Sequence, residues 1–196
     1  MENVALLLLS GIAGYFIGAF PTGVVVARGW GAPDVRWAGS GHIGTTNAYR
    51  QAGLVAAVLV ALVDLFKGVA AVSLGMALTG DPWALPVAGV AAVIGHCWSA
   101  YICFRGGMGL ATAGGIFLWW LPLGPVVFVI LWLGARAMLH HTARAVLVGL
   151  ALGTPITLLL WRPAPPVIAF TLAAVAVLLV RHLSDFHRQY NVIRET

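Results

Sequence analysis

A polar stretch at residues 38–50, AGSGHIGTTNAYR, interrupts an otherwise apolar chain. Its three glycines permit backbone conformations in which successive N–H groups converge on an anion. Ser40, Thr46 and Asn47 add hydrogen-bond donors, and the planar fork of Arg50 can grip a phosphate. These residue types at this spacing favour a phosphate-binding turn. A flexible loop between two helices is the alternative.

A second stretch of this character is FRGGMGLATAGG, at residues 104–115. Three of its glycines precede a predicted helix start: Gly106, Gly107 and Gly109. Backbone N–H groups there could hold a phosphate at the helix N-terminus. The stretch is not a Walker A loop, because the GxxxxGK[ST] order is absent and Met108 carries no charge. Close helix packing is the alternative reading, and we favour it for Gly114 and Gly115.

One apolar segment contains two opposite charges, Asp64 and Lys67, which lie three residues apart and can therefore pair on one helix face. Charges inside a membrane usually face a bundle interior or a polar cavity, although a purely structural pair is possible. We interpret His96 as an ordinary residue at a helix end, and His140 and His141 as part of a solvated loop.

The tail that follows the last apolar segment carries two polar pairs at helical spacing. His182 lies one turn from Asp185, and His187 lies one turn from Asn191. One pair is expected to face the glycine-bearing stretches, and a simple basic anchor at the membrane surface is the alternative. No histidine–carboxylate arrangement has the spacing of zinc ligands, so no metal or other cofactor is predicted.

The elements that position these residues are predicted to be membrane helices. Of the 196 residues, 61% are hydrophobic and only 9% are charged, whereas a soluble domain carries about 25% charged residues. The apolar stretches are continuous rather than alternating, which favours helices over a barrel. We predict an all-α, polytopic membrane protein with seven transmembrane helices in one domain, residues 1–196. The predicted spans are 3–27, 53–79, 84–103, 109–122, 124–139, 145–161 and 166–182.

The fourth of these segments is short, because a crossing takes about 20 apolar residues. If all seven cross, one set of loops receives most of the arginines: Arg28, Arg36, Arg50, Arg105, Arg136, Arg144, Arg181, Arg188 and Arg194. The opposite set receives only Arg162, with Glu2 and Asp81. The positive-inside rule then places the N-terminus outside, and the C-terminus and both glycine-bearing stretches in the cytoplasm. The arginines are scattered through short loops, so no nucleic-acid partner is predicted.

Taken in order, these pieces resemble the bacterial acyl-phosphate:glycerol-3-phosphate acyltransferases. The chain has GSGHIGTTNAYR where the family has GSGNxGATNxxR, and GHCWSAYICFRGGMGLAT against GHxxPxxxxFKGGKGVAT. DLFKG lies between them, and RHLSDFHR follows against RHRENIxR. The resemblance covers nearly the whole chain and marks it as a divergent member.

The resemblance implies a seven-helix bundle in the bacterial inner membrane, with its active site at the cytoplasmic face. The implied reaction moves a fatty acyl group from acyl phosphate to the 1-hydroxyl of glycerol 3-phosphate, in phospholipid biosynthesis. It uses no metal and no coenzyme A. The implied partners are acyl phosphate, glycerol 3-phosphate and membrane lipid, and we expect a monomer.

The resemblance also implies roles for individual residues. The expected catalytic residues are Ser40, Arg50 and His182. The expected substrate-binding residues are Thr46, Asn47, Lys67, Arg105, Gly106, Gly107, Gly109, Thr112 and Asp185. His187 and Asn191 are the alternatives if the tail aligns differently.

Four residues depart from the family pattern: His42, Thr45, Met108 and Asp185. Met108 replaces a lysine and Asp185 an asparagine, so the pocket is expected to be about two charges less positive. One lost charge-assisted hydrogen bond, of about 1.5–3 kcal/mol, would weaken phosphate binding about ten- to a hundredfold. Arg105 or Arg50 could compensate.

Two other classes of function remain open. A catalytically silent or acceptor-shifted relative would bind lipid phosphate, and Met108 and Asp185 favour that reading. A small-anion transporter would use the intramembrane charges, but no internal repeat of the kind common in transporters is evident. Acyltransferases that use an H-x4-D pair as general base are disfavoured, because no histidine here has an aspartate at that spacing.

Overall fold

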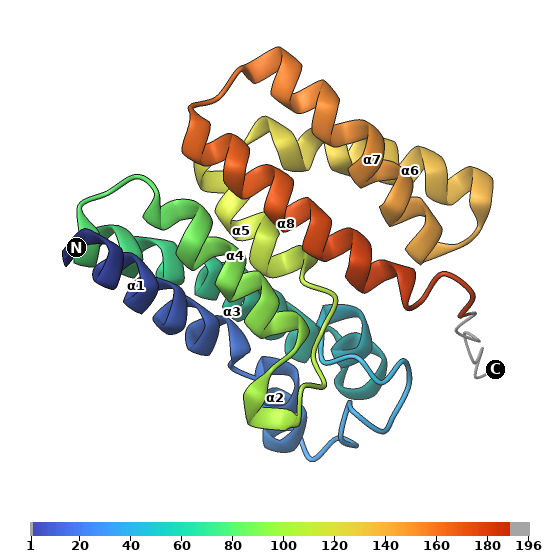
Figure 1. Ribbon diagram of the computed structural model, residues 1–196. Coiled ribbons are helices and arrows are strands. Elements are labelled where there is room, and N and C mark those ends of the chain that lie inside the picture. Colours follow the sequence, from blue (N-terminus) through green and yellow to red (C-terminus); the bar gives the residue numbers. More distant parts are fainter. Residues whose placement is uncertain (1, 189–196) are drawn as a thin grey trace.

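The computed structural model describes residues 2–188. Within that range the chain forms eight α-helices and one short 3₁₀ helix, without a β-strand, which confirms the all-helical prediction (Figure 1). The helices are α1 (Glu2–Ala19), α2 (Thr22–Gly29), α3 (Thr45–Thr79), α4 (Ala84–Cys97), α5 (Leu110–Trp120), α6 (Leu123–Leu139), α7 (Thr142–Trp161) and α8 (Pro165–Leu183), and the 3₁₀ helix η1 (Ala100–Ile102) follows α4.

The first three predicted segments differ most from the observed helices, and in the third α4 ends at Cys97 rather than at residue 103. The first is broken between α1 and α2, where Pro21 has no N–H to continue the ladder. The second begins eight residues earlier than predicted, at Thr45 rather than residue 53, and is interrupted at Gly53, whose φ is +82°. The polar residues 45–50 are therefore helical, whereas the sequence had suggested a loop.

The helices run back and forth between two ends of the bundle. Figure 1 shows the N-terminus, the α3–α4 turn and the α7–α8 connection at one end. The connection from α2 to α3, the α6–α7 turn and the last described residues lie at the other. Both polar stretches, residues 38–50 and 104–109, belong to this second end, as the sequence predicted.

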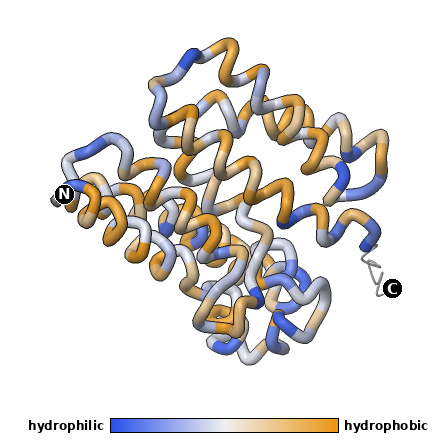
Figure 2. Tube along the Cα trace, in the orientation of Figure 1, coloured by the Kyte–Doolittle hydropathy of each residue, from blue (hydrophilic) through white to orange (hydrophobic). Residues whose placement is uncertain are grey.

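The outer surface of the bundle is apolar. Figure 2 shows mostly hydrophobic helix bodies, with the hydrophilic stretches concentrated near their ends. Large side chains such as Leu8, Leu159 and Trp119 are exposed, which is stable only against lipid. Five of the described stretches are long and apolar enough to cross a membrane: Asn3–Gly29, Thr45–Thr79, Ala84–Ile102, Thr142–Trp161 and Pro165–Leu183.

The remaining apolar helices, α5 and α6, are shorter, with 11 and 17 residues. At 1.5 Å per residue, α5 extends only about 16 Å, roughly half of a hydrocarbon core of about 30 Å. Full crossing by the fourth predicted segment therefore stays a prediction.

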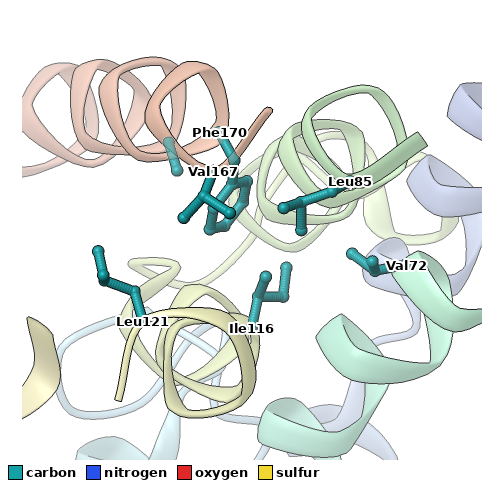
Figure 3. Close-up of a cluster of buried hydrophobic side chains, with 7 residues drawn as sticks. Val72, Leu85, Ile116, Leu121, Val167 and Phe170 are labelled. Atoms are coloured by element: carbon teal, nitrogen blue, oxygen red, sulfur yellow. The ribbon is translucent and has the colours of Figure 1, made fainter. Parts of the chain in front are cut away.

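One core cluster joins α3, α4, α5 and α8. Figure 3 shows Phe170 and Val167 of α8 facing Leu85 of α4, with Val72 and Ile116 completing the contact. Phe170 and Ile116 are fully buried. Because these helices come from distant parts of the chain, this packing fixes the end of α8 relative to α3 and the start of α5. The polar stretches are attached to those same helices.

Candidate functional site

A polar pocket of about 270 Å³ lies where six segments meet. These are the loop 38–44, α3 from its start to its middle, the end of α4, the turn that leads into α5, the start of α7 and the end of α8. Seven of the predicted site residues line it: Ser40, Thr46, Asn47, Arg50, Gly109, His182 and Asp185. Residues far apart in the sequence are thus brought together as expected.

Asn47 shapes the first wall of the pocket. Its side-chain amide donates to the carbonyls of Val35, Ala38 and His42 at 2.9–3.0 Å, and its Oδ1 accepts from the Ser40 N–H at 3.2 Å. Gly39 has a φ of +60°, and a Cβ there would overlap the Asn47 amide. Asn47 was expected to bind substrate, but its polar atoms are occupied by the loop backbone, so it positions Ser40.

The helical start of α3 presents the donor side chains. Because α3 begins at Thr45, Thr46 and Arg50 lie four residues apart on one helix face. Both line the pocket, and both are exposed. An arginine fork beside Ser40 can bind a phosphate at two oxygens.

His182 contributes an acceptor nitrogen from the end of α8. Its Nδ1 lies 2.8 Å from the Leu178 carbonyl oxygen. A carbonyl only accepts, so Nδ1 carries the hydrogen and Nε2 of the neutral ring is the acceptor. The alternative His187 is exposed and stacks edge-on against Phe186, and Asn191 lies outside the described residues. Within residues 2–188, His182 rather than His187 therefore lines the pocket, as the alignment without a gap implied.

The backbone of the glycine turn, residues 106–109, is hydrogen-bonded to neighbouring parts of the protein. Arg181 donates to the Gly107 carbonyl at 2.9 Å and to the Gly106 carbonyl at 3.2 Å, and the Gly107 N–H donates to the His96 carbonyl at 3.0 Å. A Cβ at Gly107 would overlap the His96 ring. Of the three predicted phosphate-binding glycines, only Gly109 lines the pocket. Leu110 and Ala111 follow it there, so the first turn of α5 faces the pocket with unpaired backbone N–H groups.

The intramembrane pair forms as predicted, but Lys67 does not line the pocket. Its Nζ lies 2.8 Å from Asp64 Oδ1 and donates to the Phe20 carbonyl at 3.1 Å. Thr22 donates to the same carboxylate oxygen at 2.8 Å. The pair therefore ties the break between α1 and α2 to the middle of α3.

Two further predicted residues also lie outside the pocket wall. The Arg105 guanidinium stacks on the Trp37 ring, 4.1 Å from its centroid, and Arg105 does not line the pocket. Thr112, also in the first turn of α5, is fully buried and does not line the pocket. Neither position supports a direct contact with substrate.

Several pocket residues were missed by the sequence analysis. Asp64 and His96 line the inner part of the pocket, with His96 Nδ1 3.6 Å from the Asp64 carboxylate. Thr142 and Ala143, which follow the histidine pair that we interpreted as a solvated loop, line the opposite wall. His140 is exposed, as expected, and neither histidine of that pair lines the pocket. The sequence analysis made no prediction for Thr142 and Ala143. Their small size and absence of charge left no signal in the sequence.

His42 and Asp185 line the pocket as partners. His42 Nε2 lies 2.8 Å from Asp185 Oδ2, and the two side chains are 12% and 4% exposed. Burial lowers the pKa of His42 from its ordinary value, against the opposing effect of the Asp185 carboxylate. A carboxylate only accepts, so Nε2 carries the hydrogen and donates to Asp185. Arg188 lies 3.5 Å from the second carboxylate oxygen. The expectation that Asp185 simply adds a negative charge to the pocket is corrected, because its charge is paired.

An apolar groove of about 90 Å³ adjoins the polar pocket. Leu110 lines both, and the groove continues between α5, α6, α7 and α8 along residues such as Phe117, Phe128 and Leu178. The site therefore combines hydrogen-bond donors for anionic groups with an apolar extension, which suits an amphiphilic substrate with a phosphate head group.

Comparisons with known proteins agree with this arrangement. The family model for glycerol-3-phosphate acyltransferase matches residues 8–192. A curated glycerol-3-phosphate acyltransferase of Rubrobacter xylanophilus is 41% identical over 183 residues, which cover 93% of this chain and 88% of that protein. One of Synechococcus sp. (strain JA-3-3Ab) is 40% identical over 186 residues, covering 92% and 88%.

Solved structures show the same fold. The crystal structure of PlsY, an integral membrane glycerol 3-phosphate acyltransferase, in its glycerol 3-phosphate form has a TM-score of 0.78 and 26% identity, and the match covers 96% of this chain and 92% of that one. Its lysophosphatidic acid form gives 0.77 and 25%, covering 96% and 91%. By both sequence and structure, the chain belongs to the glycerol-3-phosphate acyltransferase family.

Proposed function

We propose that this protein transfers a fatty acyl group from acyl phosphate to the 1-hydroxyl of glycerol 3-phosphate, giving lysophosphatidic acid and phosphate in phospholipid biosynthesis. The observation that carries the proposal is the convergence of Ser40, Arg50 and His182 in one pocket of a chain that belongs to this family. Arg50, Ser40 and the first turn of α5 supply donors for two phosphate groups.

The chemistry requires little covalent help from the protein. Acyl phosphate is a mixed anhydride, so its carbonyl carbon is already activated and phosphate is a good leaving group. The acceptor hydroxyl oxygen attacks that carbon, the bond from carbon to the phosphate oxygen breaks, and phosphate departs with the electron pair. The hydroxyl proton passes to a phosphate oxygen. His182 Nε2 is placed to accept a hydrogen bond from the hydroxyl and orient it, and proximity supplies much of the rate.

The membrane arrangement follows from the same geometry. The apolar groove lined by Phe117 and Phe128 suits the acyl chain, while the head groups stay in the polar pocket. We place the pocket at the cytoplasmic face of the bacterial inner membrane, with the N-terminus outside, because the loops at its end carry most of the arginines. We expect the protein to act as a monomer.

The function is tested by phosphate release from palmitoyl phosphate, measured with and without glycerol 3-phosphate. The proposed enzyme gives release that depends on the acceptor and forms lysophosphatidic acid. A transporter or a silent lipid-phosphate binder gives no such turnover. A panel of other polyol phosphates distinguishes an acceptor-shifted relative.

Two arginines allow a matched test of the pocket itself. Arg50→Ala removes a charge-assisted contact and should raise the KM for glycerol 3-phosphate about ten- to a hundredfold. Arg105→Ala removes a cation of the same kind from a position stacked on Trp37 and should change that KM less than about threefold. Equal effects of the two variants, or normal transfer by Arg50→Ala, would contradict the assignment.

A further inference from the structure

The pair formed by His42 and Asp185 does more than cancel a charge. The two residues are separated by 143 positions in the sequence, yet His42 Nε2 and Asp185 Oδ2 are 2.8 Å apart. Both belong to the four positions at which the chain departs from the family motifs. Because these two departures are in direct contact, we consider them as one feature.

The backbone of His42 belongs to the Ser40 loop. Its carbonyl accepts from the Asn47 amide at 2.9 Å, and its N–H donates to the Ser40 hydroxyl oxygen at 3.4 Å. Holding His42 in place therefore also helps to hold the Ser40 loop.

The other side of the pair belongs to the end of α8. His42 Nδ1 lies 3.5 Å from Arg181 Nη2, and Arg181 holds the carbonyls of Gly106 and Gly107. Asp185 comes one turn after His182, whose Nε2 faces the substrate in the proposed reaction. The pair thus joins three separate pocket segments: the Ser40 loop, the glycine turn and the His182 end of α8.

We propose that His42 and Asp185 form a positioning pair that holds the Ser40 loop against the His182 end of α8, at the spacing that acyl transfer to glycerol 3-phosphate requires. This inference rests on the proposed function. Both imidazole nitrogens are engaged, Nε2 by Asp185 and Nδ1 by Arg181, so His42 acts through Ser40 and Arg181 rather than on the substrate. The charged and titratable groups around it are Asp185, Arg181, Arg188 and His182.

A double-mutant cycle tests whether the two residues act as a unit. His42→Leu and Asp185→Leu should each lower kcat/KM for glycerol 3-phosphate about tenfold, and the double Leu variant should also lose about tenfold rather than about a hundredfold. The double variant His42→Asn with Asp185→Asn restores a hydrogen-bonding pair without charge, and should regain activity to within about threefold of the wild type. The losses should fall mainly on KM.

The Asp34–Arg36 pair offers a matched control in the same connection between α2 and α3. Its Nη2–Oδ2 distance is 2.6 Å, and neither residue lines the pocket. Asp34→Asn should leave kcat/KM unchanged. Thermal unfolding midpoints in detergent accompany every variant, so that a loss of activity in a folded protein is separated from a loss of folding.

The proposal is overturned if the two Leu losses multiply, or if the Asn double variant is no more active than the Leu double variant. It is also overturned if only the unfolding midpoints change. Wild-type protein without acceptor-dependent phosphate release would defeat the proposed function instead. Calorimetric binding of glycerol 3-phosphate to the wild type, the two single Leu variants and the two double variants then tests the pair on its own. Equal affinities of all five proteins would reject the positioning pair.

Discussion

Met108 lines the phosphate-binding part of the proposed site but carries no charge. It lines the pocket from within the glycine turn, between Gly107 and Gly109, yet its thioether offers a phosphate no donor and no charge. The neighbouring Arg105 does not make up for this, because its guanidinium lies on Trp37. Among the described residues that line the pocket, Arg50 is the one arginine or lysine.

A lysine at position 108 should therefore strengthen acceptor binding. Met108→Lys is expected to lower the KM for glycerol 3-phosphate by about tenfold or more, because a charge-assisted hydrogen bond contributes about 1.5–3 kcal/mol. Steady-state kinetics with palmitoyl phosphate as donor measures the change. Met108→Leu, which keeps size without charge, is the control and should behave as the wild type. An unchanged KM in the lysine variant would reject the lost contact.

Residue types and motif spacing predicted part of the site well. Ser40, Arg50 and His182 were expected to meet, and they line one pocket. Lys67 and Arg105 were expected there for the same reason and do not line it. A sequence shows that a cation lies near a motif, but the direction of a side chain depends on neighbours such as Asp64 and Trp37 that only packing supplies.

At the scale of elements, the short helix α5 depends on close contact with α3. Gly115 of α5 lies against the Leu65 carbonyl of α3, whereas a Cβ at the adjacent Gly114 would meet nothing within 4 Å. The sequence analysis assigned both glycines to helix packing. That prediction is confirmed for Gly115 and wrong for Gly114, because successive helix positions face about 100° apart and only one of them meets α3.

These adjacent glycines give a matched stability test. Gly115→Ala should force α3 and α5 apart and lower the free energy of unfolding by about 1–3 kcal/mol. Gly114→Ala should be neutral or stabilising by up to about 1 kcal/mol, because alanine favours helix more than glycine does. Thermal or denaturant unfolding in detergent measures both. A larger loss from Gly114→Ala than from Gly115→Ala would contradict the packing described here.

At the scale of the whole molecule, the two native cysteines provide a probe of orientation. Cys103 is exposed in the turn that precedes the pocket, and Cys97 is fully buried. If the pocket faces the cytoplasm, a membrane-impermeant maleimide should label Cys103 in inside-out vesicles and not in intact spheroplasts. Labelling measured by mass shift checks this.

Two variants control the labelling experiment. Cys103→Ser should abolish the reaction, since Cys97 is inaccessible. Asp81→Cys in that background places a thiol in the α3–α4 turn at the opposite end of the bundle and should reverse the pattern. Labelling of Cys103 from outside would overturn the proposed orientation.

The sequence by itself determined that lipid surrounds most of the protein, and it determined the order of the helices. Apolar composition and continuous apolar runs require backbone hydrogen bonds to be satisfied within helices, and these properties are local. The motifs determined which residue types gather at one end. Only the tertiary structure decided that His42 contacts Asp185 and that Lys67 donates to the Phe20 carbonyl at the break between α1 and α2. The same holds for the start of α7, which lines the pocket. Such contacts join helices far apart in the chain, and their geometry depends on how whole helix faces pack.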